Sequence, residues 1–154
     1  MSAGGLSACA RVLVASLYKE EGSVNFPAIY LLHGRGGSPN GSVMQLETEL
    51  RVCEPEQNYF RPSMPHSDES VTPLPSMLHL RGLGVPNGAL IIGISLGGLV
   101  AAKLQETERP DLHVICISSP THAEDTELTM KMERRVALYS SGDEVISGRT
   151  ERWP

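Results

Sequence analysis

Residues 89–103 read Ala89-Leu-Ile-Ile-Gly-Ile-Ser95-Leu-Gly-Gly-Leu-Val-Ala-Ala-Lys103, and this stretch decides the fold. Its first half is an apolar run that is typical of a strand buried in a sheet. Its second half consists mainly of helix formers, so a strand passes into a helix through Gly93-Ile-Ser95-Leu-Gly97. Small residues at Gly93 and Gly97 allow a sharp turn and close packing of helix on strand. We therefore expect Ser95 at the tip of this turn, above one edge of a sheet.

Apolar runs and helical patterns alternate along the rest of the chain. The sequence predicts strands at 28–33, 58–61, 89–94, 112–117 and 136–139, and helices at 42–53, 76–82, 96–107 and 124–133. Residues 11–17 fit a strand or a short helix, and four prolines within 62–75 favour a loop. The alternation indicates an α/β fold, with a mostly parallel sheet and helices on both faces. With 154 residues, we expect one domain over 1–154, with residues 1–10 poorly ordered.

Composition and charge exclude several classes of protein. The formal net charge is −5 and the basic residues are scattered, which argues against nucleic acid as a partner. The adjacent pair Arg134-Arg135 is interpreted as a solvated helix end. No apolar stretch approaches the roughly 20 residues that span a bilayer, so no membrane partner is expected. Phosphate-loop, dinucleotide and metal-ligand spacings are missing, so we expect no metal and no cofactor.

The cysteines indicate a reducing compartment. Cys9, Cys53 and Cys116 are odd in number, and their spacings fit no zinc pattern. Cys116 lies inside an apolar run and is expected to pack as a small buried hydrophobic residue. A cytoplasmic location is the natural expectation for such thiols.

Residues with chemical potential follow the predicted strands. They lie in five segments: His33-Gly34-Arg35-Gly36-Gly37, Pro65-His66-Ser67-Asp68, Ser95, Ser118 to His122, and Gly142-Asp143. The carboxyl ends of parallel strands meet at one edge of a sheet, where sites of α/β proteins form. We therefore expect these five segments to gather at a single edge.

This grouping favours nucleophilic catalysis by Ser95, whose hydroxyl needs a neighbouring base to take its proton. The N–H of Leu96 opens a helix and can donate to an oxyanion, and the N–H of Arg35 is the second expected donor. Asp143 would hold an imidazole in place. Plainer interpretations stay open, because Asp143 also fits a turn residue and the Arg35 side chain also fits a solvated loop position.

With these motifs the chain resembles the α/β-hydrolase superfamily, and is most similar to small lidless bacterial esterases and the phospholipase/carboxylesterase type. The resemblance covers residues 25–146 and is carried by Leu31 to Ser38, Gly93 to Gly98 and Ser141 to Val145. It implies Ser95 as nucleophile, Asp143 as acid, and Leu96 and Arg35 as oxyanion donors. It further implies a supporting role for His33, Gly34, Gly93 and Gly97.

The family order places a histidine after the acid, yet no histidine follows Asp143. Three explanations stay open. Either the chain has lost a C-terminal segment that carries the base, or His122 replaces that base from the loop after strand 112–117. In the third explanation the protein is an inactive scaffold that binds or dimerises through an uncovered strand at 136–139. His66 is interpreted as a loop or pocket residue.

The sequence thus predicts a serine hydrolase that cleaves small carboxylic esters through an acyl intermediate on Ser95. The interval between strands 112–117 and 136–139 is too short for a lid domain, and an open site suits short-chain esters. The alternative is a catalytically weak or inactive hydrolase-like module.

Overall fold

A computed structural model describes residues 25–65, 73–119, 128 and 133–138. The expectations for residues 1–10 and 11–17, for most of the helix at 124–133, and for the segment around Asp143 lie outside these residues.

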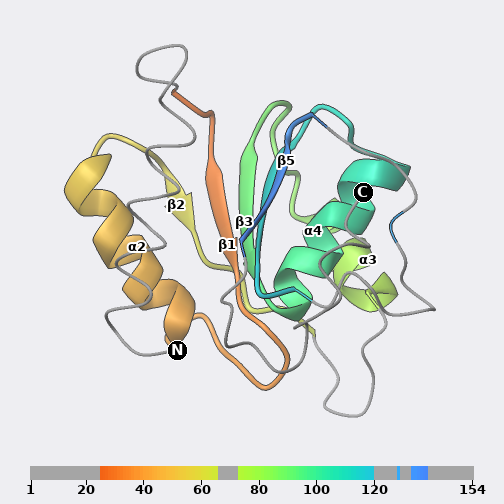
Figure 1. Cartoon of the computed structure of the whole chain (residues 1–154), viewed down its shortest axis with the longest axis horizontal. Helices are drawn as coiled ribbons and strands as arrows, with labels where there is room; N and C mark the ends of the chain where they lie inside the picture. The colour runs from red at the N-terminus through yellow and green to blue at the C-terminus, as the bar shows by residue number, and fades with distance from the viewer. Residues whose placement is uncertain (1–24, 66–72, 120–127, 129–132, 139–154) are drawn as a thin grey trace.

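Five strands form one parallel sheet in the order β2-β1-β3-β4-β5 (Figure 1). The strands are β1 (Ile29–Leu32), β2 (Tyr59–Phe60), β3 (Leu90–Ile94), β4 (His113–Ile117) and β5 (Arg135–Leu138). Each overlaps a strand that the sequence predicted, and the expectation of a parallel α/β sheet is confirmed. Burial on both faces explains why the runs of β1, β3 and β4 are almost continuously apolar rather than alternating.

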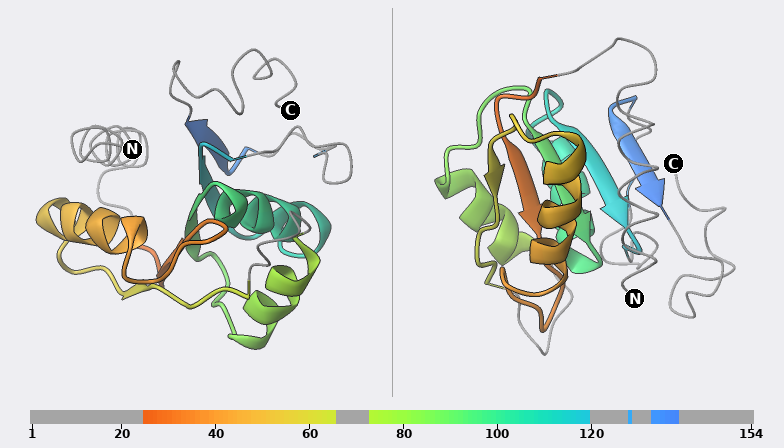
Figure 2. Two further views of the ribbon diagram at one scale, coloured as in Figure 1. Left: turned by 90° about the horizontal axis from the view of Figure 1, so that it is seen from below. Right: turned by 90° about the vertical axis from the view of Figure 1, so that its left-hand side faces the viewer.

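Helices cover both faces of the sheet (Figure 2). Helix α2 (Ser42–Cys53) lies on one face, where its buried residues Val43, Leu46 and Leu50 pack with Leu31. Helices α3 (Leu74–Gly82) and α4 (Leu96–Thr107) cover the other face, where Leu32 is buried. Successive strand residues point to opposite faces, so each strand contributes to both cores.

Two expectations need correction. Helix α3 begins at Leu74, inside the segment 62–75 that its prolines assigned to a loop. Pro75 lies in the first turn, where a backbone N–H has no helical acceptor and proline is tolerated. The interpretation of Arg134-Arg135 as a solvated helix end is wrong for Arg135. This residue begins β5, and its side chain is 1% exposed and lies 3.3 Å from Glu106.

The strand order reverses direction between β1 and β3. The chain leaves β1 for β2 on one side and returns to β3 on the other. Ligands of open α/β sheets bind at such a switch point, outside the carboxyl ends of the strands. Leu32 pairs with Gly93 in the register, so β1 and β3 end almost level and the loop after β1 meets Ser95.

Candidate active site

Ser95 occupies a strained turn between β3 and α4. Its backbone angles are φ 53° and ψ −121°, in a region that favours glycine. Such a conformation costs of the order of 1–3 kcal/mol and persists only where the surroundings impose it. Here the Ser95 N–H donates to the Ile117 carbonyl at 2.8 Å, which ties the turn to the end of β4. The turn that the sequence predicted is therefore present.

Gly93 and Gly97 make this turn sterically feasible. A Cβ atom at Gly93 would lie 2.2 Å from the backbone nitrogen of Gly98. A Cβ atom at Gly97 would lie 2.5 Å from the carbonyl oxygen of Leu32. The first turn of α4 thus lies directly on β3 and on the end of β1, with no room for a side chain at either position.

The loop after β1 packs directly against Ser95. A Cβ atom at Gly34 would lie 3.1 Å from the Ser95 Cβ and 3.7 Å from its Oγ. Leu96, on the other side of Ser95, is the first residue of α4, so its N–H has no acceptor within the helix. The structure thus brings Ser95, Leu96 and the His33–Arg35 loop together, as predicted.

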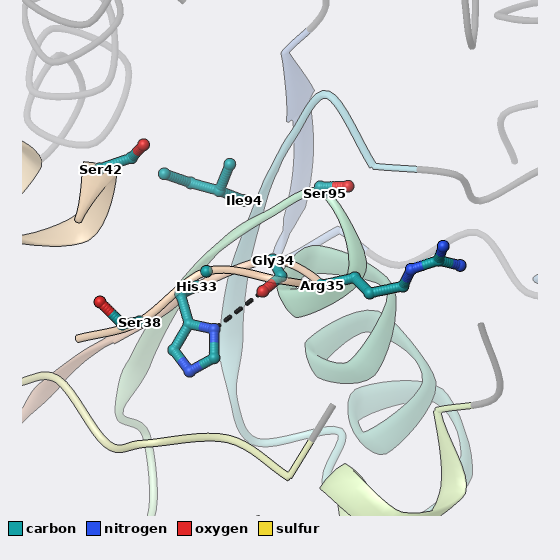
Figure 3. A pocket seen from close by; sticks show the side chains of 8 residues that line it. His33, Gly34, Arg35, Ser38, Ser42, Ile94 and Ser95 are labelled. Atoms are coloured by element: carbon teal, nitrogen blue, oxygen red, sulfur yellow. Dashed lines mark hydrogen bonds between the residues drawn. The ribbon is translucent and has the colours of Figure 1, made fainter. Parts of the chain in front are cut away.

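His33 uses both ring nitrogens to hold this loop. Nδ1 lies 2.8 Å from the Gly34 carbonyl oxygen, and the Met64 N–H donates to Nε2 at 2.9 Å. A carbonyl oxygen only accepts and an N–H only donates, so the network assigns the neutral tautomer with its proton on Nδ1. The ring is buried and points away from Ser95 (Figure 3). His33 therefore supports the loop and is not positioned as a base for Ser95.

The Gly34 carbonyl fixes the orientation of the next peptide N–H. It accepts from His33 and also from the Gly37 N–H at 3.1 Å. The described residues contain no cis peptide bond, so the Arg35 N–H points opposite to the Gly34 carbonyl. In Figure 3 that carbonyl is directed toward His33 and away from Ser95. The Arg35 N–H is therefore directed to the side on which Ser95 lies.

A pocket of about 220 Å³ opens at this edge. It is lined by His33, Gly34, Arg35, Gly37, Ser38, Ser42, Ile94 and Ser95 (Figure 3). The described lining consists of two serines at the start of α2 and in the loop before it, Ser95, two glycines, His33 and Arg35, and Ile94 is its one aliphatic residue. Ser38 belongs to the motif Leu31 to Ser38, for which the sequence predicted no individual role at this position. Sequence reasoning missed Ser42, because only the sheet topology brings the start of α2 to the turn at Ser95.

The remaining histidines with described positions lie away from Ser95. His79 is exposed on α3, and His113 begins β4, with its ring 5.2 Å from that of Phe26. His66, His122 and Asp143 lie outside the described residues. The structure therefore leaves the base and the acid of the expected triad as predictions.

Comparison with protein-family models found no match to this chain, and comparison with curated proteins found none either. Within the described segments, no helix is both long and apolar enough to cross a bilayer. Those segments also contain no group of three or more histidine, cysteine or acidic residues that could hold a metal ion.

Cys116 behaves as the sequence predicted. It is fully buried on β4 behind α4, and its Sγ lies 3.4 Å from the Gly98 carbonyl oxygen. Burial raises the pKa of its thiol to about 12, against a smaller opposite effect of Arg135. The neutral thiol is thus a packing group and not a second nucleophile.

Proposed function

We propose that this protein is a serine hydrolase of the α/β-hydrolase type, and that it cleaves small carboxylic esters through Ser95. The observation that carries the proposal is the backbone of Ser95, at φ 53° and ψ −121° in a pocket at the switch point of the sheet. A non-glycine residue in this conformation is costly, and such strain concentrates at functional sites. The same turn lifts a hydroxyl from the strand end into the pocket.

The proposed reaction is acyl transfer to water. Ser95 Oγ attacks the ester carbonyl carbon while its proton passes to a base, and a tetrahedral oxyanion forms. The N–H groups of Leu96 and Arg35 stabilise that oxyanion, and the helix dipole of α4 assists. The intermediate collapses, the alcohol leaves with the proton, and water then releases the acid from Ser95 by the reverse order of steps.

The base remains the open part of the proposal. Both nitrogens of His33 are engaged, and His79 and His113 lie elsewhere, so none of the described histidines serves Ser95. We assign the role to His122, with Asp143 as its acid partner, as the order of the predicted strands suggests. The fact that none of the described histidines serves Ser95 also favours a second candidate, an inactive hydrolase-like module that binds or dimerises.

The pocket suits a short acyl group. A volume of about 220 Å³ is small compared with the 300–1,000 Å³ typical of sites for drug-sized ligands. Its wall offers little aliphatic surface for a long chain. We therefore expect turnover of acetyl and butyryl esters to exceed that of long-chain esters.

A fluorophosphonate probe tests the proposal, because it reacts covalently only with an activated serine. We expect labelling of the wild-type chain, loss of labelling in Ser95→Ala, and retention in Ser63→Ala, an exposed serine outside the pocket. Labelling and nitrophenyl acetate turnover should also fall at least about 100-fold in His122→Ala. Absence of any labelling favours the inactive module, and retained activity in His122→Ala overturns the assignment of the base.

A further inference from the structure

Arg35 differs from the other arginines of the described chain. Arg51, Arg61, Arg81, Arg109 and Arg135 each pair with a carboxylate. Arg134 donates to the Asp111 carbonyl oxygen at 3.2 Å. Within residues 25–65, 73–119, 128 and 133–138, no carboxylate or carbonyl group hydrogen-bonds to the Arg35 guanidinium. In a chain of net charge −5, Arg35 is exposed and lines the pocket, and its guanidinium is the unpaired one within those ranges.

The described residues around Arg35 in the pocket carry no opposing charge. Arg35 is the one residue of fixed charge among the described lining residues, and none of these is an aspartate or a glutamate. Asp143, the proposed acid, lies outside the described residues. Helix α2 begins at Ser42 and helix α4 at Leu96, both beside the pocket, and neither carries an acidic residue in its first turn. Their N-terminal N–H groups therefore add partial positive charge to that of the guanidinium. The charges and dipoles of these described residues favour an anion.

The Ser95 hydroxyl and the Arg35 side chain are directed to the same side in Figure 3, whereas Ser38 and Ser42 lie on the other side. A substrate whose carbonyl carbon meets Ser95 Oγ can therefore extend a second group toward the guanidinium. A planar guanidinium binds carboxylate in a bidentate manner, which adds geometric selectivity to charge.

We propose that Arg35 selects esters that carry a carboxylate, or an anion of similar size, near the scissile bond. The inference rests on the proposed esterase function and names the substrate class of the same pocket. The anion can belong to the acyl part or to the alcohol part, and the chemistry at Arg35 is the same in both cases. An exposed arginine that is merely solvated would leave the choice between charged and neutral esters unchanged.

Two matched pairs of substrates test the inference. For the alcohol part, 4-acetoxybenzoate is compared with its neutral methyl ester. For the acyl part, monophenyl adipate is compared with phenyl hexanoate. For each pair, the value of kcat/KM for the anionic ester is divided by that for the neutral ester. For one of the two pairs, we expect this ratio to be about tenfold higher in wild type than in Arg35→Gln. Arg35→Lys should keep most of this ratio, and 0.5 M NaCl should reduce it.

Arg81→Gln is the matched control, because it removes the same charge from a site on α3 that pairs with Glu108. Its ratio should equal that of wild type. Equal ratios in wild type and Arg35→Gln for both substrate pairs would overturn the inference. A ratio that falls equally in Arg35→Gln and Arg81→Gln would also overturn it, since net charge alone would then explain the preference.

A binding measurement separates this inference from the proposed function. In Ser95→Ala, NMR titration compares 4-acetamidobenzoate with its methyl ester, and adipic acid monoanilide with hexananilide. We expect one anionic amide to bind about tenfold more tightly than its neutral partner, and this difference to vanish when Arg35→Gln is added. Selective binding without ester turnover in wild type refutes the esterase but not the anion site. Ester turnover without preferential binding of the anionic amides refutes the anion site but not the esterase.

Discussion

His33 Nδ1 lies 2.8 Å from the carbonyl oxygen of Gly34, and this contact sets the peptide that carries the Arg35 N–H. Nε2 of the same ring accepts from the Met64 N–H at 2.9 Å, so the loop after β1 is tied to the segment after β2. One buried imidazole thereby fixes the direction of a backbone donor without touching the pocket's reactive atoms. It is a positioning residue, held by a residue 31 positions further along the chain.

We expect His33→Ala to lower kcat for nitrophenyl acetate by about tenfold to 100-fold, with a smaller change in KM. Loss of one oxyanion donor typically costs about 100-fold to 1,000-fold, and a displaced donor costs less. A role in stability alone would leave kcat per folded molecule unchanged. Steady-state kinetics on the folded fraction, with His79→Ala as control, measure the difference.

The ¹⁵N chemical shifts of the His33 ring give a second, independent reading of this arrangement. They should report the neutral form with the proton on Nδ1. A proton on Nε2 would contradict the assigned network, because that nitrogen would then face the Met64 N–H without a lone pair.

Ser95→Gly should be more stable than Ser95→Ala, by about 1 kcal/mol. Both remove the hydroxyl, but only glycine relieves the strain at φ 53°, and its greater chain entropy offsets part of the gain. Urea unfolding of both variants measures the difference. Ser63 has no positive φ, so Ser63→Gly should be less stable than Ser63→Ala. An alanine variant at position 95 that equals or exceeds the glycine variant in stability would show that the turn is unstrained.

The sequence was sufficient for the elements whose signal is local. Helices 42–53 and 96–107 were predicted with the bounds that the structure has, because the glycine-rich segments before them mark where they begin and the helical apolar spacing marks how far they extend. The turn at Ser95 was predictable for the same reason. Its requirement for Gly93 follows from atoms of Gly97 and Gly98, which lie close in the chain.

The sequence was insufficient where the partner is distant. Arg135 was expected in water because two adjacent arginines are normally exposed, and its partner Glu106 lies 29 residues earlier on another element. His33 was assigned to the oxyanion loop, but its anchor at Met64 is a backbone N–H, which leaves no trace in residue identity. Such pairs are decided by topology, and only the assembled sheet reveals them.

Gly93→Ala should destabilise the protein by about 3 kcal/mol or more. Its Cβ would lie 2.2 Å from the Gly98 nitrogen, and both contacting groups are backbone, so the turn must open. Gly82→Ala is the control, because a Cβ there meets nothing within 4 Å. In the last turn of α3 this change should be neutral or stabilising by up to about 1 kcal/mol. Urea midpoints compare the two, and equal effects would contradict the steric account.

Protonation of Asp111 in acid should lower the stability of the protein. Two hydrogen bonds from Arg109, both at 2.9 Å, lower the pKa of its carboxyl to about 2, and the Gly88 N–H at 3.0 Å contributes. Because this pKa lies below its unfolded value, the stabilisation is complete above about pH 4 and is lost as the pH falls toward 2. Partial exposure limits the loss to about 1 kcal/mol.

The pH dependence of urea unfolding between pH 4 and pH 2 measures this contribution. The wild-type slope should exceed that of Asp111→Asn, in which the titrating group is missing. Glu56→Gln, an exposed carboxylate in the turn before β2, should keep the wild-type slope. Identical slopes in wild type and Asp111→Asn would show that the contact with Arg109 does not persist in solution.

Removing one partner of the ion pair between Arg135 and Glu106 should lower the free energy of unfolding strongly, whereas replacing both partners by apolar residues should lower it little. Their side chains are 1% and 5% exposed, so Arg135→Met removes the cation beside a buried carboxylate, at a cost of about 3–5 kcal/mol. The double variant Arg135→Met, Glu106→Leu removes both charges and should recover most of that loss. Arg81→Met, which breaks an exposed pair, should cost far less than Arg135→Met. Urea unfolding gives these values and that of Glu106→Leu. A double variant that loses the sum of both single effects would contradict the prediction, because it would mean that the two side chains are not energetically coupled.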